Sequence, residues 1–122
     1  MKKPIVYIAH PIGGDVENNI KSVLAIVRQL SIENEVIPFA PYIVDVQALD
    51  DANPIERGIG FTHNMAMFER GIIDEVWLYG GRISNGMATE IKWAEVHVIP
   101  VKQMWCDHCL KSNRDCKCDE PF

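Results

Sequence analysis

The sequence lacks several features that would assign the protein to a class at once. No apolar run among its 122 residues approaches the ~20 that a membrane-crossing helix needs. The net charge of −5 argues against a general nucleic-acid-binding surface. The two lysines near the start precede an apolar run that is too short for a signal peptide. The G-x-G-x-x-G dinucleotide fingerprint is also missing. We therefore expect a cytoplasmic protein whose partners include neither membrane nor nucleic acid.

Cysteine is absent from the first 105 residues, and all four cysteines lie in the tail over residues 105–122. Cys106-x-x-Cys109 has a common zinc-knuckle spacing, whereas Cys116-x-Cys118 is less usual. Four thiolates suit tetrahedral zinc and leave no open position for catalysis, so we expect a structural zinc ion. Disulfides and a reduced, disordered tail are the alternatives, and a cytoplasmic location disfavours disulfides.

The pattern of apolar residues predicts alternating strands and helices in the first half of the chain. Ile5–Ala9 and Val36–Ala40 are short apolar runs typical of strands, and Pro38 suggests an edge position or an early end for the second. Between them, Asp15 can cap a helix whose apolar residues follow a 3.6-residue period. These residues are Val16, Ile20, Val23, Leu24, Val27 and Leu30.

The second half repeats the alternation after an irregular connection. Residues 41–54 read as a loop of unusual length, which makes them a candidate lid or subunit contact, with plain solvated surface as the alternative. A helix weakened by Gly58 and Gly60 follows over residues 55–70. Residues 76–79 form a β-favouring run without strict alternation, which is typical of a strand that is covered on both faces.

A helix and a last strand over residues 98–101 complete the chain before the tail. This order predicts an α/β fold with a mainly parallel sheet of four to five strands flanked by helices, flavodoxin-like or Rossmann-like. We expect one such domain over residues 1–104. Ligands of these sheets bind at the carboxyl ends of the strands, which places loop 10–14, the segment after Ala40 and the turn over 80–86 on one rim.

Several polar side chains belong to this rim. They are Tyr7, His10, Arg82, Ser84, Asn85 and Glu90. Gly13 and Gly14 directly precede a predicted helix, whose free backbone N–H groups favour an anion such as phosphate. An ordinary strand-to-helix turn is the alternative, because two adjacent glycines are not a specific signal.

Glu90 is the residue that fits its expected surroundings least. It belongs to a helix that Ser84 or Asn85 can cap. Glu90 lies three residues after Met87 and four before Ala94, so it faces the same side as these apolar residues. A carboxylate there is costly unless it is paired, hydrogen-bonded or in a cleft. Two interpretations follow: a structural ion pair or boundary residue, and a functional carboxylate.

Three segments carry a resemblance to a known family: YIAHP at residues 7–11, DEVWLYG at 74–80 and SNGMATE at 84–90. They resemble the opening strand and loop, the central strand and the D-x-G-x-x-x-E segment of the nucleoside 2-deoxyribosyltransferase-like superfamily, in particular its small bacterial and phage members. The resemblance covers about residues 4–102 and excludes the tail.

The resemblance implies a nucleoside or nucleotide N-glycosidase or deoxyribosyltransferase that needs no cofactor for its reaction. Glu90 is implied as the nucleophile that attacks the anomeric carbon and displaces the base, and Tyr7 and His10 complete the catalytic set. The residues expected to bind substrate are Ala9, Pro11, Gly13, Gly14, Asn64, Arg82, Ser84, Asn85 and Gly86. The paired glycines and Arg82 would suit a 5′-phosphate. Because the family assembles its sites near subunit contacts, we also expect a homo-oligomer.

The chain departs from the family pattern at two positions. Ser84 stands where the motif has its first aspartate, and Asn64 stands where family transferases carry another. Neither side chain can protonate a departing base, so His10, His63 or Tyr7 would have to do so, or the base would have to leave readily. The open hypotheses are transfer, hydrolysis, nucleotide binding without turnover, and an interaction module with a zinc tail.

Overall fold

The computed structural model describes residues 2–118 and contains a four-stranded parallel sheet. Its strands are β1 (Ile5–Ala9), β2 (Ile37–Phe39), β3 (Glu75–Leu78) and β4 (Val101–Gln103), in the spatial order β2-β1-β3-β4. Strand β1 is central because it pairs with β2 on one side and with β3 on the other. The α/β class and the mainly parallel sheet predicted from the sequence are therefore confirmed, as is the edge position that Pro38 gives to β2.

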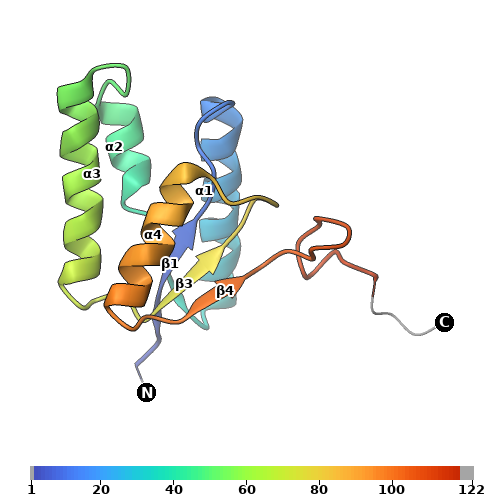
Figure 1. The fold of residues 1–122 in the computed structure, drawn as a ribbon. Helices are drawn as coiled ribbons and strands as arrows, with labels where there is room; N and C mark the ends of the chain where they lie inside the picture. The colour runs from blue at the N-terminus through green and yellow to red at the C-terminus, as the bar shows by residue number, and fades with distance from the viewer. Residues whose placement is uncertain (1, 119–122) are drawn as a thin grey trace.

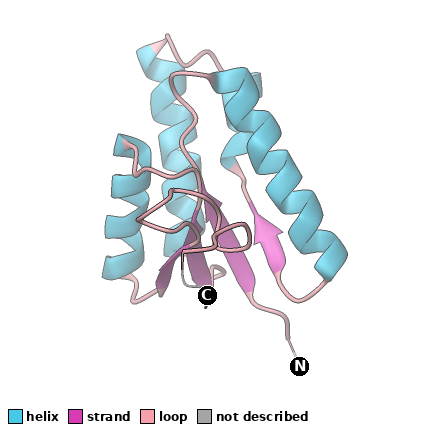
Figure 2. Ribbon diagram, turned by 90° about the vertical axis from the view of Figure 1, so that its right-hand side faces the viewer, coloured by secondary structure: helices cyan, strands magenta, loops and turns pink. Residues whose placement is uncertain are grey.

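Helices cover both faces of the sheet. α3 (Pro54–Glu69) and α4 (Asn85–Val96) lie on one face and α1 (Val16–Glu33) lies on the other (Figure 1). Figure 2 shows the sheet between these layers. Because side chains alternate along a strand, Tyr7 belongs to the core cluster under α3 and α4, whereas Val6 and Ile8 belong to the cluster under α1. Burial on both faces explains why the strands read as continuous apolar runs.

The first helix follows its predicted period but not its predicted cap. Val23 and Leu30 are buried along α1, as the spacing of the apolar residues indicates. The Asp15 side chain makes no capping hydrogen bond, and only its backbone carbonyl enters the helix ladder, by accepting from Asn19. Among residues 2–118, no helix combines the length and the apolar character that a membrane span requires.

Residues 41–54 were predicted to form a loop, and this prediction is wrong in its first half. α2 (Tyr42–Ala48) is a short helix, and only the residues after it form a turn. The helix that follows has the expected length, begins and ends one residue earlier than predicted, and is less broken than expected. Asn53 caps it by accepting hydrogen bonds from the backbone N–H groups of Ile55 and Glu56, and it continues through both internal glycines.

The last strand lies later than the sequence indicates. The predicted strand at 98–101 overlaps β4 at Val101 only. Val98 adopts a left-handed backbone conformation with φ of 55° and is 89% exposed, so it belongs to the turn after α4.

The described part of the tail continues β4 as a small hairpin. Trp105 is buried in the core beside α4 and forms an antiparallel bridge with Ser112. The Cys106 N–H donates to the carbonyl of Lys111, so residues on both sides of the turn are paired. Residues 119–122 of the predicted tail lie outside the described residues.

Candidate functional site

Glu90 lies at the carboxyl ends of β1 and β3, on the wall of a cavity of about 410 Å³. It is 8% exposed and shares the buried side of α4 with Met87 and Ala94, as its spacing predicts. The chain leaves β1 toward β2 on one side and reaches β3 on the other, so the cavity opens where the strand order reverses. Such a switch point is the usual ligand position in an open α/β sheet.

Two polar side chains, and no basic one, hold Glu90 among the described residues. Its Oε2 accepts a hydrogen bond from the Tyr7 hydroxyl and a second one from Asn64 Nδ2 at 3.0 Å. Tyr7 Oη also lies 2.9 Å from Asn64 Oδ1, which closes a three-membered ring of contacts. Glu90 is therefore not the structural ion pair that was one of its two interpretations.

The Oε1 atom of Glu90 faces the cavity. Every hydrogen bond of the described part of the chain that involves this carboxyl group is made by Oε2. No buried side-chain nitrogen or oxygen in that part lacks a partner, so an Oε1 without a partner must be accessible to solvent. One oxygen is thus anchored by protein groups and the other is free to meet a ligand.

Burial raises the pKa of Glu90 to about 7, although the hydrogen bonds from Tyr7 and Asn64 act in the opposite direction. The hydrogen bonds that the ring can form in each protonation state also favour the neutral form of Glu90. When Glu90 is neutral, it can donate to Tyr7, Tyr7 to Asn64 Oδ1, and Asn64 Nδ2 to Glu90. When Glu90 is ionised, Tyr7 donates to it and Asn64 Oδ1 loses its donor. The same carboxyl group can therefore exist in both protonation states near neutral pH.

Two tyrosines surround this carboxyl group on the sheet side. Tyr7 is fully buried, and burial followed by the nearby Glu90 charge holds its pKa well above its usual value. Tyr42 lines the cavity, and the same two causes raise its pKa. The Tyr42 hydroxyl donates to the carbonyl of Ile8 rather than to Glu90. Both phenols therefore remain protonated at neutral pH.

His10 forms part of the cavity wall but is held in one neutral form. Its Nδ1 lies 2.6 Å from the carbonyl oxygen of Pro11, which can only accept, so this nitrogen carries the proton. Its Nε2 lies 3.0 Å from Ser22 Oγ and accepts from that hydroxyl. Burial, together with the charge of Arg82, lowers the pKa of His10 against the opposing bond to Pro11. His10 is therefore a wall residue with both ring nitrogens engaged.

The loop after β1 and the turn after β3 meet at the cavity rim. Arg82 Nη2 donates to the carbonyl of Gly13 at 3.4 Å, which ties the two segments together. Ser84 caps α4 by accepting from the N–H of Met87 at 3.2 Å. A Cβ built on Gly80, whose φ is +101°, would lie 2.5 Å from Pro11 Cδ, so this contact requires glycine.

A second hollow of about 640 Å³ continues from the first toward α2 and α3. The two cavities share Ile12, Gly13, Tyr42, Asn85, Gly86 and Glu90. Asn64, Trp93 and Arg57 line the far part of the second one. Glu90 thus stands where a smaller and more polar hollow joins a larger and more apolar one, an arrangement that can hold a ligand with two chemically different halves.

Most of the predicted site residues converge. The first cavity is lined by His10, Gly13, Arg82, Ser84, Asn85, Gly86 and Glu90, and Asn64 lines the second. Ala9 and Tyr7 are buried behind the wall, Pro11 packs against Gly80, and Gly14 precedes α1 without lining either hollow. His63 is exposed and pairs with Asp45 at 3.2 Å.

The sequence reasoning missed Tyr42, Ile12 and Met87 as lining residues. The sequence does contain a signal for Tyr42: it follows the end of β2 and so belongs to the rim formed by the strands' carboxyl ends. It was overlooked because residues 41–54 were interpreted as an irregular loop.

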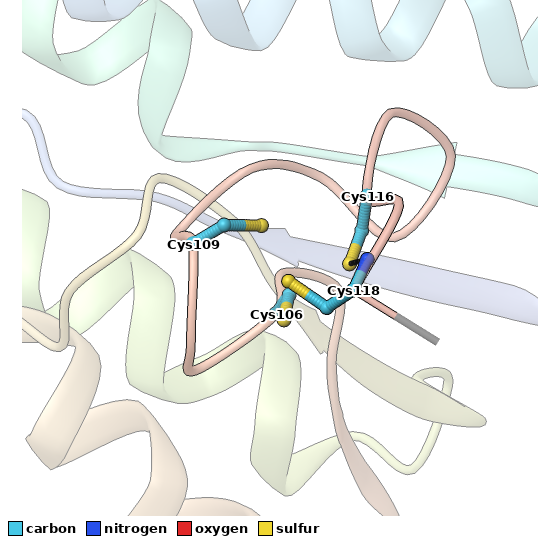
Figure 3. Close-up of side chains that lie close together, drawn as sticks. All are labelled: Cys106, Cys109, Cys116 and Cys118. Atoms are coloured by element: carbon cyan, nitrogen blue, oxygen red, sulfur yellow. Dashed lines mark hydrogen bonds between the residues drawn. The ribbon is translucent and has the colours of Figure 1, made fainter. Parts of the chain in front are cut away.

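The four cysteines of the tail form a second chemical cluster. The Sγ atoms of Cys106, Cys109, Cys116 and Cys118 all lie within 4.8 Å of one another, although no disulfide joins them (Figure 3). The backbone N–H groups of Cys109 and His108 point at the Cys106 sulfur and lower its pKa to about 6. Four sulfurs so placed can bind a metal ion such as zinc, and the donor set fits a closed tetrahedral site.

The fold and the cavity together define the class: a single-sheet α/β domain with a cavity at its topological switch point. Residues 4–104 match the family model described as Domain of unknown function (DUF7768). Since this match spans most of the chain, the protein belongs to that family. No curated protein and no solved structure matches the chain. The family match ends at residue 104, directly before the cysteine tail.

Proposed function

We propose that the protein is a nucleoside or nucleotide N-glycosidase related in its chemistry to the deoxyribosyltransferases, with Glu90 as the nucleophile. The observation that supports this most is the state of the Glu90 carboxyl group. It stands at the junction of two hollows, makes no ion pair among the described residues, and presents Oε1 to the cavity while Tyr7 and Asn64 anchor Oε2. A carboxylate held in this way can attack an electron-deficient carbon.

The reaction would proceed in two displacements. Ionised Glu90 Oε1 forms a bond to the anomeric carbon, and the bond to the base nitrogen breaks with its electron pair leaving on the base. Water then attacks the anomeric carbon and gives up a proton to solvent, while the bond from this carbon to Glu90 Oε1 breaks with its electron pair. The sugar is released and the carboxylate is restored, as in retaining glycoside hydrolysis. The hydrogen bonds of Tyr7 and Asn64 to Oε2 keep the carboxyl group oriented in both steps.

The need to protonate the departing base restricts which substrates the site can accept. Ser84 is engaged as a helix cap, Asn64 is an amide, and His10 has both nitrogens engaged. Tyr7 is a buried phenol of raised pKa. None of these groups is a ready acid, so we propose a substrate whose base departs without protonation, as a cationic base does. NAD-related nucleotides contain such a base.

A 5′-phosphate has a suitable position at the rim. Arg82 is exposed there, and the loop that it contacts precedes the first turn of α1, where backbone N–H groups have no helical partner. Glu17, in the same turn, opposes this charge preference in part. We therefore propose nucleotides over free nucleosides.

Incubation with a panel of deoxynucleosides, nucleoside monophosphates and NAD-related nucleotides, followed by chromatography of the free base, tests this function. We expect base release by the wild type from at least one nucleotide. Glu90→Gln removes the nucleophile while keeping the volume of the side chain, and it should abolish release. Lys92→Ala is the matched control, because Lys92 is an exposed residue of the same helix and lines neither hollow. Equal release by Glu90→Gln and the wild type rejects the proposal.

Nucleotide binding without turnover is the second candidate. The lack of a ready acid among Ser84, Asn64, His10 and Tyr7 favours it, because a bound nucleotide would then keep its base. Calorimetry that detects binding of a nucleoside monophosphate, with no free base after prolonged incubation, selects this function over the first.

For the tail we propose a structural zinc ion bound by Cys106, Cys109, Cys116 and Cys118. Trp105 is the only buried residue of the described tail, so hydrophobic packing alone gives it little stability. Metal analysis of the purified protein should give about one zinc ion per chain. A Cys109→Ser variant should lose the ion while retaining the fold of residues 4–104.

We also propose a homo-oligomer. Val44 on α2 and Ile55 on α3 are 69% and 76% exposed, and apolar side chains so exposed can be covered by a second copy. Sedimentation should give a mass above that of one chain, and Ile55→Glu should restore the monomer.

A further inference from the structure

The cysteine loop touches the rim of the candidate active site. A Cβ built on Gly81 would lie 3.6 Å from the carbonyl oxygen of Leu110 and 3.8 Å from Leu110 Cβ, so the turn after β3 packs directly on the residue that follows Cys109. Gly81 has φ of +78° and lies between Gly80 and Arg82. The contact thus ends one residue before the guanidinium that lines the cavity.

The position of Leu110 depends on the geometry of the cysteine knuckle. Its backbone is left-handed, with φ of 61°, a conformation that is strained for a residue with a Cβ. Its N–H donates to the carbonyl of Cys106 at 2.8 Å, which closes the loop that a metal would grip at Cys106 and Cys109. Leu110 is 59% exposed, so packing contributes little to holding it there.

From Gly81 the contacts continue into the loop after β1. Gly80 meets Pro11 and approaches His10, since a Cβ built on it would lie 3.5 Å from His10 Cε1. His10 separates the main cavity from a further hollow of about 280 Å³ under the tail. An unbroken series of contacts therefore joins the cysteine cluster to both segments of the rim.

We propose that the metal-bound cysteine loop is a working part of the ligand site: by holding Leu110 against Gly81, it fixes the turn over 80–82 and the loop over 10–14 in the arrangement that receives an anionic ligand. The class of ligand rests on the proposed function. The mechanical link, by which the cysteine loop fixes the turn over 80–82 and the loop over 10–14, does not. Metal binding and anion binding are then coupled, and each increases the affinity for the other.

Hydrogen exchange of the full-length protein tests the mechanical link without any ligand. We expect zinc loading to slow amide exchange in the tail and also at residues 80–84 and 10–14, compared with protein stripped by a chelator. Residues 54–60, in the first turns of α3, are the internal reference, and their amide exchange should not change. Protection that is confined to the tail overturns the proposal.

A variant separates metal binding from the link. Leu110→Gly deletes the Cβ that meets Gly81 and tolerates the left-handed backbone, and the more flexible glycine holds the carbonyl oxygen less firmly. The variant should therefore retain zinc but weaken the zinc-dependent protection at residues 80–84. Lys111→Ala, the exposed neighbour, is the matched control and should behave as the wild type. If Leu110→Gly keeps the protection, the contact with Gly81 is not the link and the proposal fails.

Calorimetry with inorganic phosphate and deoxyadenosine monophosphate tests the coupling. We expect zinc-loaded protein to bind them at least about fivefold more tightly than stripped protein. Equal affinities in the two states contradict the proposal. If neither zinc-loaded nor stripped protein binds these compounds, the proposed nucleotide function is rejected instead. Hydrogen exchange then decides by itself whether the mechanical link exists.

Discussion

Removal of the Tyr7 hydroxyl should raise the pKa of Glu90 further. Tyr7 donates to Glu90 Oε2, and this bond opposes the effect of burial. A hydrogen bond to a charged group is worth about 1.5–3 kcal/mol and one to a neutral group about 0.5–1.5 kcal/mol. The Tyr7→Phe substitution therefore costs the ionised form about 1–1.5 kcal/mol more than the neutral form. At 1.36 kcal/mol per unit, the pKa should rise by about one unit, from about 7 to about 8.

Carbon-13 NMR of labelled glutamate side chains, assigned by comparison with Glu90→Gln, measures this shift directly. Tyr42→Phe is the control, because the Tyr42 hydroxyl donates to the Ile8 carbonyl and its loss should leave the titration within about 0.3 units. If the pKa of Glu90 in Tyr7→Phe stays at its wild-type value or falls, the hydrogen-bond ring does not stabilise the carboxylate and the account of the site is wrong.

Three further predictions concern stability and metal. The folded-state pKa of Glu90 lies about 2.5 units above its ordinary value of 4.5, so its neutral form is favoured by folding. The contribution of neutral Glu90 to the free energy of unfolding is complete below about pH 4.5 and falls by up to ~3 kcal/mol as pH rises through 7. Urea unfolding at pH 5 and pH 8 should show this fall in the wild type and a smaller one in Glu90→Gln. Gly80→Ala should lower the free energy of unfolding by about 1–3 kcal/mol through strain against Pro11. Gly58→Ala, in open space within α3, should raise it by about 0.5–1 kcal/mol. Equal effects of the two substitutions in thermal unfolding would contradict the packing described. Chelation of zinc should change the fluorescence of Trp105 while far-ultraviolet dichroism stays nearly constant, and loss of helical signal would show that the tail supports the whole domain.

The sequence predicts the fold well wherever one regular pattern spans a whole element. Strands β1 and β3 are apolar runs covered on both faces, and α1 repeats its apolar positions over several turns. The weak points are short elements. α2 has seven residues and follows a proline, and β4 has three, so tertiary contacts rather than local pattern decide both.

The candidate site was predictable in its centre but not in its partners. The period of α4 places Glu90 on the buried side, and the carboxyl-end rule brings the loop after β1 to the same rim. The ring around Glu90 could not be predicted from spacing, because Tyr7 and Asn64 lie 83 and 26 residues away in the chain. The engagement of His10 by Pro11 and Ser22 likewise depends on how α1 packs beside the loop.

Trapping the sugar on the protein tests the central claim most directly. A reaction with an accepted nucleotide, quenched in acid and digested with a protease, is analysed by mass spectrometry of the peptides. The account predicts a glycosyl adduct on the peptide that contains Glu90, and its absence in Glu90→Gln. Base release without an adduct on Glu90, or with an adduct on another residue, would contradict the assignment of this carboxylate as the nucleophile.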